Sequence, residues 1–554
     1  MKISTRAAAV ITTLLIVASG SGRAEEVTAF INVNVIPMTG ETILEDHTVI
    51  IANGLIRSVG PSASITVPPG AGIIDGGGAY LMPGLADMHT HLDAHDNNPA
   101  HLVLYLAHGI TTVRSFDGTR LNLEWRKGTA DGTLTGPAIL TNGPVLMGLH
   151  GSERGRDRVV KAFRFAILLL PLGLGIAVFI ISLIIRRIAA GKGVAPPRRK
   201  RSLPALIASF VALFVVGLLL SWFRIIPFMT VGRFLISPHY FVVENASQAR
   251  AEVRRQKKAG YDFLKIYDFL EEESYCAAVD EAKRIGFFVS GHIPNQIPLE
   301  IIATSGQAEI AHINELQSYF WIGYNRGIDI DPDIKNKEYP YDFDLIPPTV
   351  TLLRENGISV VSTIVEKEIM CLLIEDTETI LAGPEYRLVP RHLVQRWKTR
   401  GRNVTSCRNQ GPYRRNHMMP FLAELTRALY EGGVTITLGG AVSNEGVIPG
   451  YHYLSQFELL ADAGIPAYDL LEMATKNAGM IVGRMGRDAN FGTVEAGRRA
   501  DLLLLAGDPL DDINNIKDQI GVMSQGRWLA REELDRMVEE LAGEYQIEYP
   551  EDKL

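Results

Sequence analysis

The chain has 554 residues, more than one hydrophobic core usually organises, so about two to four structural units are expected. Its net charge of −7 and pI near 6.0 exclude attraction to nucleic acid through the overall charge of the chain. Apolar residues make up 47% and the mean hydropathy is +0.09, which is slightly high for a soluble enzyme and indicates membrane segments.

The N-terminus is typical of a secretory signal. Lys2 and Arg6 form a positively charged region, and the apolar run 7–19 is short for a stable membrane span. Small residues precede a possible cut after Ala24. This pattern predicts a signal peptide over residues 1–24, with an uncleaved anchor as the alternative.

Residues 25–83 alternate short strand-like runs with turns, and Asn53 and Gly54 between two apolar runs are typical of a hairpin. Residues 490–530 contain strand-like runs again. We expect these two regions to form one small β-sandwich domain from distant parts of the chain. Residues 531–554 are expected to form a helical C-terminal tail.

Two apolar runs in mid-chain, 165–185 and 202–223, contain no charged residue, and each is about long enough to cross a bilayer. They predict an inserted transmembrane hairpin over 163–227, with buried core helices as the alternative. The linker between the runs carries seven Lys and Arg residues and no acidic residue, which places it in the cytoplasm. With the exported N-terminus, this predicts a multi-pass membrane protein whose remaining domains lie on the extracytoplasmic side.

Between the two β-like ends, strand-like and helix-like segments alternate, as in a parallel sheet with crossover helices. A series of eight candidate strands predicts a closed (β/α)₈ TIM-like barrel over residues 84–485. An open doubly wound sheet is the alternative, although no GxGxxG motif follows the first strand. The candidate strands are 84–91, 110–116, 138–142, 263–267, 287–292, 309–313, 358–364 and 434–439.

His89 and His91 stand two positions apart on the first of these strands, so their imidazoles point to the same side and make half of a metal site. Two histidines at this spacing are as often structural, but the surrounding segment PGLADMHTHL (83–92) is more specific. It resembles the opening signature of the amidohydrolase superfamily.

Two further segments carry the same resemblance. LAHGITTVRSFDG (106–118) is similar to the second barrel strand of that superfamily, and AGRRADLLLLAGDPL (496–510) to its closing β-domain segment. The resemblance covers most of residues 27–530 apart from the hairpin. It is strongest to the prolidase-like and imidazolonepropionase-related branch.

Lys265 lies inside an apolar strand, where an unpaired ammonium is costly to bury. The resemblance implies that this lysine is carboxylated and bridges two metal ions, and a salt-bridged or snorkelling lysine is the alternative. His292 and His312 end successive apolar runs, where barrels place functional groups. With His89 and His91, they predict a site for two divalent metal ions, with zinc preferred.

Tyr267 follows Lys265 by two residues and is expected on the same face. The resemblance gives it a catalytic and substrate-binding role, in which its hydroxyl bonds the substrate carbonyl; a core tyrosine is the alternative. His150 occupies a region where members of the family often place a histidine that contacts the substrate.

Ala441 departs from the family pattern. In the resembling enzymes the eighth strand ends in an aspartate that binds metal and takes a proton from the attacking water, a type of help worth about 10²–10⁴-fold. The chain is therefore an inactivated variant, a slow enzyme with a rearranged site, or a natural pseudoenzyme.

The leading hypothesis is a membrane-anchored, metal-dependent hydrolase of amide or peptide bonds, acting on dipeptides or N-acyl amino acids. A catalytically silent metal-binding membrane protein is the rival, and a lactonase or esterase on the same site is a third possibility. No nucleic-acid partner is expected.

The hairpin interrupts the connection after the third candidate strand, on the functional face of a barrel. We therefore expect the site to face the bilayer, with membrane lipid as a partner and an amphipathic substrate; simple tethering is the alternative. Residues 317–348 and 366–420 are expected to be long irregular loops that act as lids or specificity elements.

Overall fold

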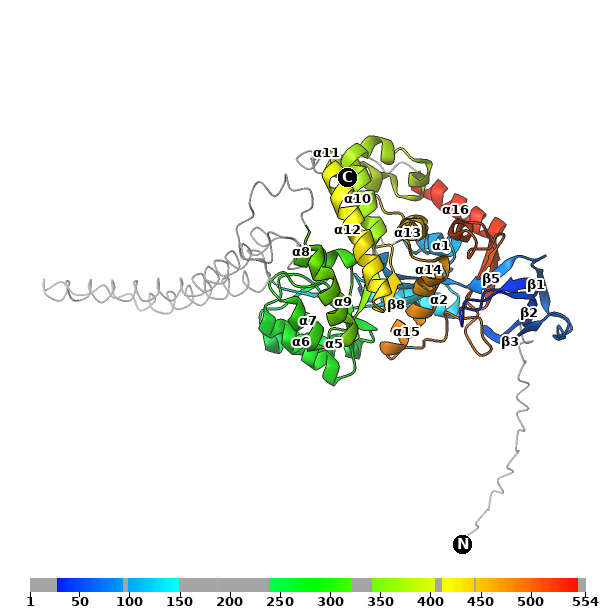
Figure 1. Cartoon of the computed structure of the whole chain (residues 1–554), viewed down its shortest axis with the longest axis horizontal. Coiled ribbons are helices and arrows are strands. Elements are labelled where there is room, and N and C mark those ends of the chain that lie inside the picture. Colours follow the sequence, from blue (N-terminus) through cyan, green and yellow to red (C-terminus); the bar gives the residue numbers. More distant parts are fainter. Residues whose placement is uncertain are drawn as a thin grey trace, which may run out of the picture.

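The computed structural model describes residues 27–92, 98–148, 187, 239–320, 341–403, 411–442 and 445–546, without the side chains of 400–403 and 411–415. The predicted signal peptide, His150 and, apart from Arg187, the segment 163–227 lie outside these residues. Figure 1 shows the described part as a mixed α/β body with a separate β-sheet at one end.

The core of the body is a ring of parallel strands. The first three form one sheet, and the next five belong to a second sheet. A parallel bridge between Asn142 and Phe263 joins the two sheets on one side. On the other side the backbone N–H of Ala441 donates to the carbonyl of His89 at 2.6 Å. In ring order the strands are β6 (Leu85–Thr90), β7 (Ile110–Ser115), β8 (Ala138–Thr141), β11 (Phe263–Ile266), β12 (Phe288–Gly291), β13 (Glu309–Ile310), β14 (Ser359–Ser362) and β15 (Ile436–Leu438).

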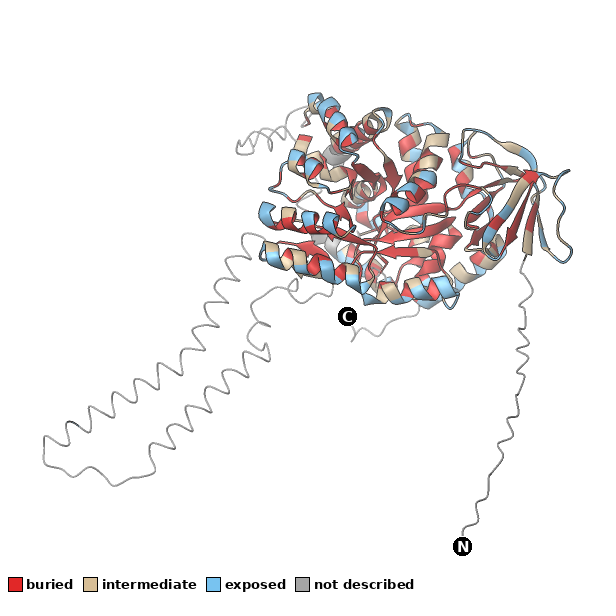
Figure 2. Ribbon diagram, turned by 90° about the horizontal axis from the view of Figure 1, so that it is seen from below, coloured by how far each residue is buried: buried red, intermediate tan, exposed pale blue. Residues whose placement is uncertain are grey.

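These strands are short and apolar, and nearly every residue in them is buried, as expected for parallel strands covered by helices on the outside. Figure 2 shows the buried strands at the centre and helices that expose one face around them. Two further strands, β9 (Val145–Met147) and β10 (Tyr240–Val242), pair in parallel beside β11 at one end of the ring.

Helices follow most strands of the ring. In α5, for example, the Asn245 side chain accepts from the backbone N–H of Gln248 at the start, and Gly260 ends the helix with φ of 90°. The helices and short helical turns around the ring are η2 (Pro99–His101), α1 (Leu102–Ala107), α2 (Arg120–Asp131), α5 (Ala246–Ala259), α6 (Glu272–Arg284), α7 (Leu299–Ser305), η5 (Ile313–Glu315), α8 (Gln317–Phe320), η7 (Phe343–Leu345), α9 (Ile346–Glu355), α14 (Ala467–Ala474) and α15 (Lys476–Arg484).

The segment expected to be an irregular loop over 366–420 is largely helical. It contains α10 (Ile364–Ile380), η8 (Pro384–Leu388), α11 (Arg391–Asn403) and the start of α12 (Gly411–Glu431), which packs near α13 (Tyr451–Asp462). Val365, Ile369 and Leu373 of α10 are buried at intervals of four residues, so one apolar stripe of the helix faces the core.

The two ends of the described chain meet in one sheet, at the right of Figure 1. Strand β5 pairs with β16 antiparallel and with β1 in parallel, and so joins the early and late strands. Asn53 and Gly54, with φ of 54° and 76°, form the turn between β2 and β3. The elements are β1 (Val27–Val35), β2 (Leu44–Ala52), β3 (Leu55–Pro61), β4 (Gly72–Asp75), β5 (Tyr80–Pro83), β16 (Leu502–Leu505), η10 (Ile513–Lys517), β17 (Gln519–Ser524), β18 (Arg527–Ala530) and the final α16 (Arg531–Tyr545).

Within the described residues, no helix has the length and apolar composition needed to cross a bilayer. The longest, α12 with 21 residues, carries five charged residues and Pro420. The prediction of a fold with an inserted transmembrane hairpin and a multi-pass membrane location is therefore wrong for the described part, and 163–227 itself, apart from Arg187, lies outside that part. A run of apolar side chains shows only that the segment favours leaving water. Crossing a bilayer also requires a continuous helix of sufficient length. The expected bilayer-facing site and lipid partner lose their support with it.

Candidate metal centre

Five predicted site residues lie at the carboxyl ends of four ring strands. His89 is on β6 and His91 follows that strand, Lys265 is on β11, and His292 and His312 follow β12 and β13. His89 is 0% exposed, Lys265 2%, His312 7% and His292 8%. Because the strands are parallel, their carboxyl ends share one face of the ring, and the five side chains converge there.

The imidazole rings form a continuous cluster. The centroid of the His89 ring lies 4.0 Å from that of His312 and 5.5 Å from that of His91. The His292 ring lies 5.1 Å from His312 and 4.2 Å from the ring of Tyr267. The Lys265 ammonium stands 5.4 Å from the Tyr267 ring centroid, so the tyrosine borders the same cluster.

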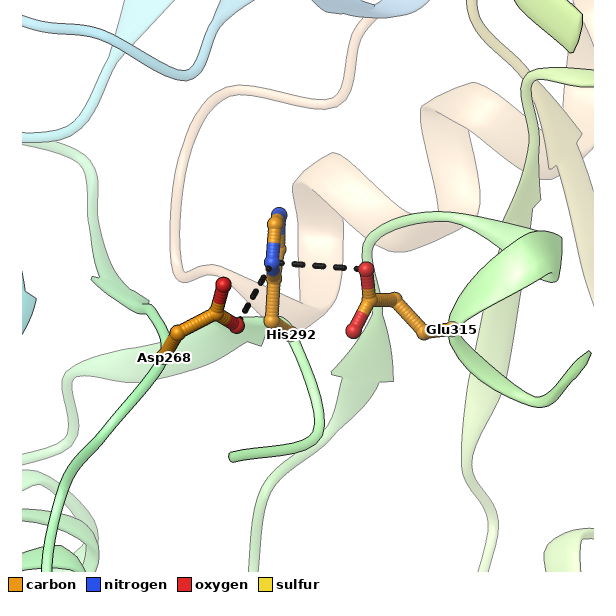
Figure 3. A group of neighbouring side chains, drawn as sticks. All are labelled: Asp268, His292 and Glu315. Carbon is orange, nitrogen blue, oxygen red and sulfur yellow. Dashed lines mark hydrogen bonds and ion pairs between the residues drawn. The ribbon is translucent and has the colours of Figure 1, made fainter. Parts of the chain in front are cut away.

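Oxygen atoms face the Nδ1 atoms of three of these histidines. His292 Nδ1 lies 3.2 Å from Asp268 Oδ1 and 3.3 Å from Glu315 Oε1, as Figure 3 shows. His91 Nδ1 lies 3.8 Å from Asp117 Oδ2.

His312 follows the same pattern. Its Nδ1 lies 2.9 Å from Thr363 Oγ1 and 3.9 Å from Glu366 Oε2. A carboxylate or hydroxyl at Nδ1 fixes the ring orientation and leaves Nε2 as the nitrogen that can bind a metal ion.

His89 differs from the other three. Both of its ring nitrogens are buried and have no hydrogen-bond partner among the described residues. Burial lowers the pKa of His89 well below its usual value, and His312 and Lys265 lower it further. The pKa of His312 is lowered in the same way, first by burial and then by His292. Both rings are therefore neutral at physiological pH, the form in which imidazole binds metals.

Lys265 carries the amine that we predicted from the sequence to belong to this site. Burial lowers the pKa of its ammonium to about 8, although Asp117, Glu315, Asp268 and Glu366 oppose that shift. The neutral form of the amine is therefore more accessible near physiological pH than that of an exposed lysine.

Asp268, His292 and Glu315 are themselves a candidate metal site, because each offers a ligand atom and these atoms lie within 4.8 Å of one another. Burial raises the pKa of Glu315, although His292 opposes this. We interpret the two carboxylates as partners that orient His292, since they approach Nδ1 as oxygen groups do at His91 and His312.

The acidic residues of the site were missed in the sequence. Asp117, Asp268, Glu315 and Glu366 each come two to five residues after the end of a ring strand. That position places a side chain on the functional face, and it is the signal by which they could have been found.

Ala441 lies just beyond the end of β15, where the family pattern led us to expect an aspartate. Ala441 is 0% exposed with φ of 49°, and its backbone closes the ring against His89. Next to it, Asp87 Oδ1 accepts from the backbone N–H groups of His89 at 3.0 Å and Gly440 at 2.9 Å. Burial raises the pKa of Asp87 to about 7 against the effect of these bonds. We regard Asp87 as a residue that holds β6 and β15 together.

A ring of parallel strands with imidazoles and an amine at its carboxyl ends defines an α/β protein with a candidate metal site. Residues 361–529 match the model of the amidohydrolase family, and the chain therefore carries an amidohydrolase family domain.

Curated relatives match only short stretches of the chain. Adenine deaminase of Ruegeria sp. (strain TM1040) is 33% identical over 99 residues, which is 18% of this chain and 16% of that protein. Imidazolonepropionase of Idiomarina loihiensis (strain ATCC BAA-735 / DSM 15497 / L2-TR) is 45% identical over 64 residues, or 11% of this chain and 16% of that protein. The chain thus spans only 16% of the length of each of these relatives.

Solved structures match over most of the chain. A Xaa-Pro dipeptidase with methionine bound in its active site has a TM-score of 0.56 at 18% identity, covering 91% of this chain and 100% of that one. A putative prolidase from Bifidobacterium longum has a TM-score of 0.56 at 19% identity, covering 93% and 99%. At these identities the similarity shows the fold alone.

Proposed function

We propose that this protein is a metal-dependent amidohydrolase that cleaves amide or peptide bonds. The observation that carries the proposal is the convergence of four histidines and one buried lysine at the carboxyl ends of β6, β11, β12 and β13. A buried neutral imidazole normally has a partner for its ring nitrogens. In a cluster of histidines, that partner is most often a metal ion.

The residues present fit two divalent ions, with zinc preferred. His89, His91, His292 and His312 would supply imidazole nitrogens, which are standard zinc ligands. The buried, unpartnered nitrogens of His89 support this directly, since a bound ion would satisfy one of them. Only a neutral amine can take up carbon dioxide, and the lowered pKa of Lys265 favours the carboxylated, bridging form.

Metal ions bound here would polarise the scissile carbonyl and supply hydroxide near neutral pH. The chain's own residues add positioning. Burial raises the pKa of Tyr267 far above its usual value, so its hydroxyl remains a donor at neutral pH and would donate to the substrate carbonyl. His150, outside the described residues, is proposed as a second contact with the substrate.

The proposed substrates are dipeptides or N-acyl amino acids. The resemblance to prolidase-like amidohydrolases supports this class, as does the fold shared with the Xaa-Pro dipeptidase described above. The position of Tyr267 beside the histidine cluster provides a donor for an amide carbonyl.

Ala441 favours a second candidate function, binding of metal without turnover. A methyl group at the end of β15 can neither bind a metal ion nor accept a proton. If no other residue accepts the proton, the site binds metal and ligand but hydrolyses slowly or not at all.

An activity panel separates the two functions. The wild-type chain and Ala441→Asp would each be loaded with zinc and assayed on dipeptides, N-acyl amino acids and an ester control. Amide hydrolysis by the wild type, lost in His89→Ala, supports the proposed enzyme. Hydrolysis only in Ala441→Asp indicates an impaired enzyme, and zinc binding without hydrolysis in either chain supports the binding role.

A further inference from the structure

Asp117, two residues beyond β7, is shared by two histidines. Its Oδ2 lies 3.8 Å from Nδ1 of His91, and its Oδ1 lies 3.1 Å from Nδ1 of His239. The carboxylate therefore lies between two imidazoles, with one oxygen facing each ring.

His239 comes from outside the ring of eight strands. It precedes β10, and its carbonyl accepts from the backbone N–H of Val145 at 2.7 Å, so it belongs to the pair of short strands beside β11. The next residue, Tyr240, places its ring 6.1 Å from that of Tyr267. The β9–β10 edge thus reaches the border of the candidate metal centre, and His239 is fixed there by its backbone.

We propose that Asp117 and His239 form a relay that orients His91, in which Asp117 acts on the ring directly and His239 acts through Asp117. The inference rests on the proposed function, because it takes His91 as a metal ligand. With Nδ1 directed at Asp117, the ring presents Nε2 to the metal. His239 Nδ1 faces the second oxygen of this carboxylate at 3.1 Å, and this contact restrains the carboxylate that lies beside His91.

The four histidines differ in how they are supported. His292 is faced by two carboxylates, and His312 by a hydroxyl and a carboxylate. Asp117 lies beside His91, and the other oxygen of this carboxylate faces His239 at the β9–β10 edge. The support of His91 therefore includes a residue from outside the ring of eight strands.

The alternative is an ion pair without consequence for the site. The side chains of His239 and Asp117 are 29% and 22% exposed, and pairs near the surface often contribute little. The two interpretations differ in one measurable quantity, the affinity of the chain for zinc.

The test is a double-mutant cycle on zinc affinity, with Asp117→Asn, His239→Gln and the double variant. The zinc dissociation constant would be measured by competition with a chromophoric chelator, starting from metal-free protein. We expect Asp117→Asn to weaken binding about 10- to 100-fold, the usual cost of removing a partner of a metal ligand. His239→Gln should weaken it about threefold or more, since it removes a bond to a charged group.

The cycle distinguishes a relay from independent effects. Because His239 acts through Asp117, His239→Gln should have no further effect in the Asp117→Asn background. The same factor in both backgrounds, or no effect in either, overturns the inference. Tyr240→Phe is the matched control on the same edge: it should leave zinc affinity unchanged, and an equal loss there would also overturn the proposal.

Metal-free melting temperatures equal to the wild type would show that the variants fold. If Asp117→Asn does not fold, His239→Gln against Tyr240→Phe decides alone, since only the former should lose affinity. Failure of the proposed function is a separate result. A wild-type chain that binds no zinc refutes the metal centre and the relay with it, whereas tight binding insensitive to His239→Gln refutes the relay only.

Discussion

Glu309→Gln tests the support beneath the candidate metal centre. Arg114 and Glu309 are both 0% exposed, and their ion pair lies inside the ring of strands. Arg114 Nη2 donates to Glu309 Oε1 at 2.5 Å, and its Nε donates to the carbonyl of Met88, next to His89, at 2.9 Å. Ser290 donates to the same carboxylate at 2.7 Å. The substitution keeps the shape of the side chain but removes the counter-charge that the guanidinium contacts directly.

Breaking a buried pair in this way costs about 3–5 kcal/mol, because the remaining charge is desolvated and uncompensated. For a cooperative unit of several hundred residues, this corresponds to a fall of about 5 °C in melting temperature. The assay is thermal unfolding of the metal-free chain, followed by circular dichroism. Glu540→Gln removes one partner of the exposed pair Arg536–Glu540 and should leave the melting temperature unchanged.

Equal melting temperatures for Glu309→Gln and the wild type would refute the reasoning. They would mean that the Arg114 guanidinium is solvated or paired in another way, and that the interior of the ring is less dry than its burial indicates.

Three further predictions concern the site, the ring and the response to acid. Metal-free Lys265→Met should have a higher melting temperature than the wild type, because a buried ammonium is costly. The same variant should bind less zinc, and a higher zinc content by mass spectrometry would contradict this. Gly118→Ala should lower the free energy of unfolding by about 1–3 kcal/mol, and with it the melting temperature, because the added Cβ would stand 1.6 Å from the carbonyl oxygen of Asn142. The control is Gly543→Ala in α16, where the added Cβ meets no atom within 4 Å and the change should be neutral or stabilising. Burial lowers the pKa of His101 to about 4 in the folded chain, so the unfolded chain binds a proton more readily below about pH 6.5. The free energy of unfolding should therefore fall as the pH drops from about 6.5 to 4, by up to about 3 kcal/mol for this residue. Thermal unfolding across this range should show a shallower acid loss in His101→Gln, and an unchanged pH profile would contradict the assignment.

The strands of the ring could be predicted because each is a short apolar run bounded by polar residues. All eight candidate strands fall on observed strands, although β13 is only Glu309–Ile310 where five residues were expected. The positions of His89, His292 and His312 at strand ends follow from the same pattern. That the early and late strands share a sheet also agrees with their strand-like composition.

Which acidic residue faces which histidine could not be predicted. Asp117, Asp268 and Glu366 lie in loops or at helix starts, and their approach to Nδ1 depends on how the strands are placed around the ring. Sequence spacing contains no information on that placement. His239 was missed for the same reason, since it reaches the site through the pairing of β10 with β9.

Two errors came from composition. The segment 366–420 was expected to be irregular, but the four-residue spacing of Val365, Ile369 and Leu373 is a helical pattern that was overlooked. The transmembrane hairpin was inferred from the length and uncharged apolar composition of two runs, and no described helix supports it.

The most direct test of the central claim is the zinc content of the purified chain by mass spectrometry after chelation and reloading. We expect about two zinc ions per chain, a large loss in His89→Ala and no loss in His47→Ala, which changes a histidine of the β-domain strand β2. A wild-type chain without stoichiometric metal, or His89→Ala with the full content, would contradict it.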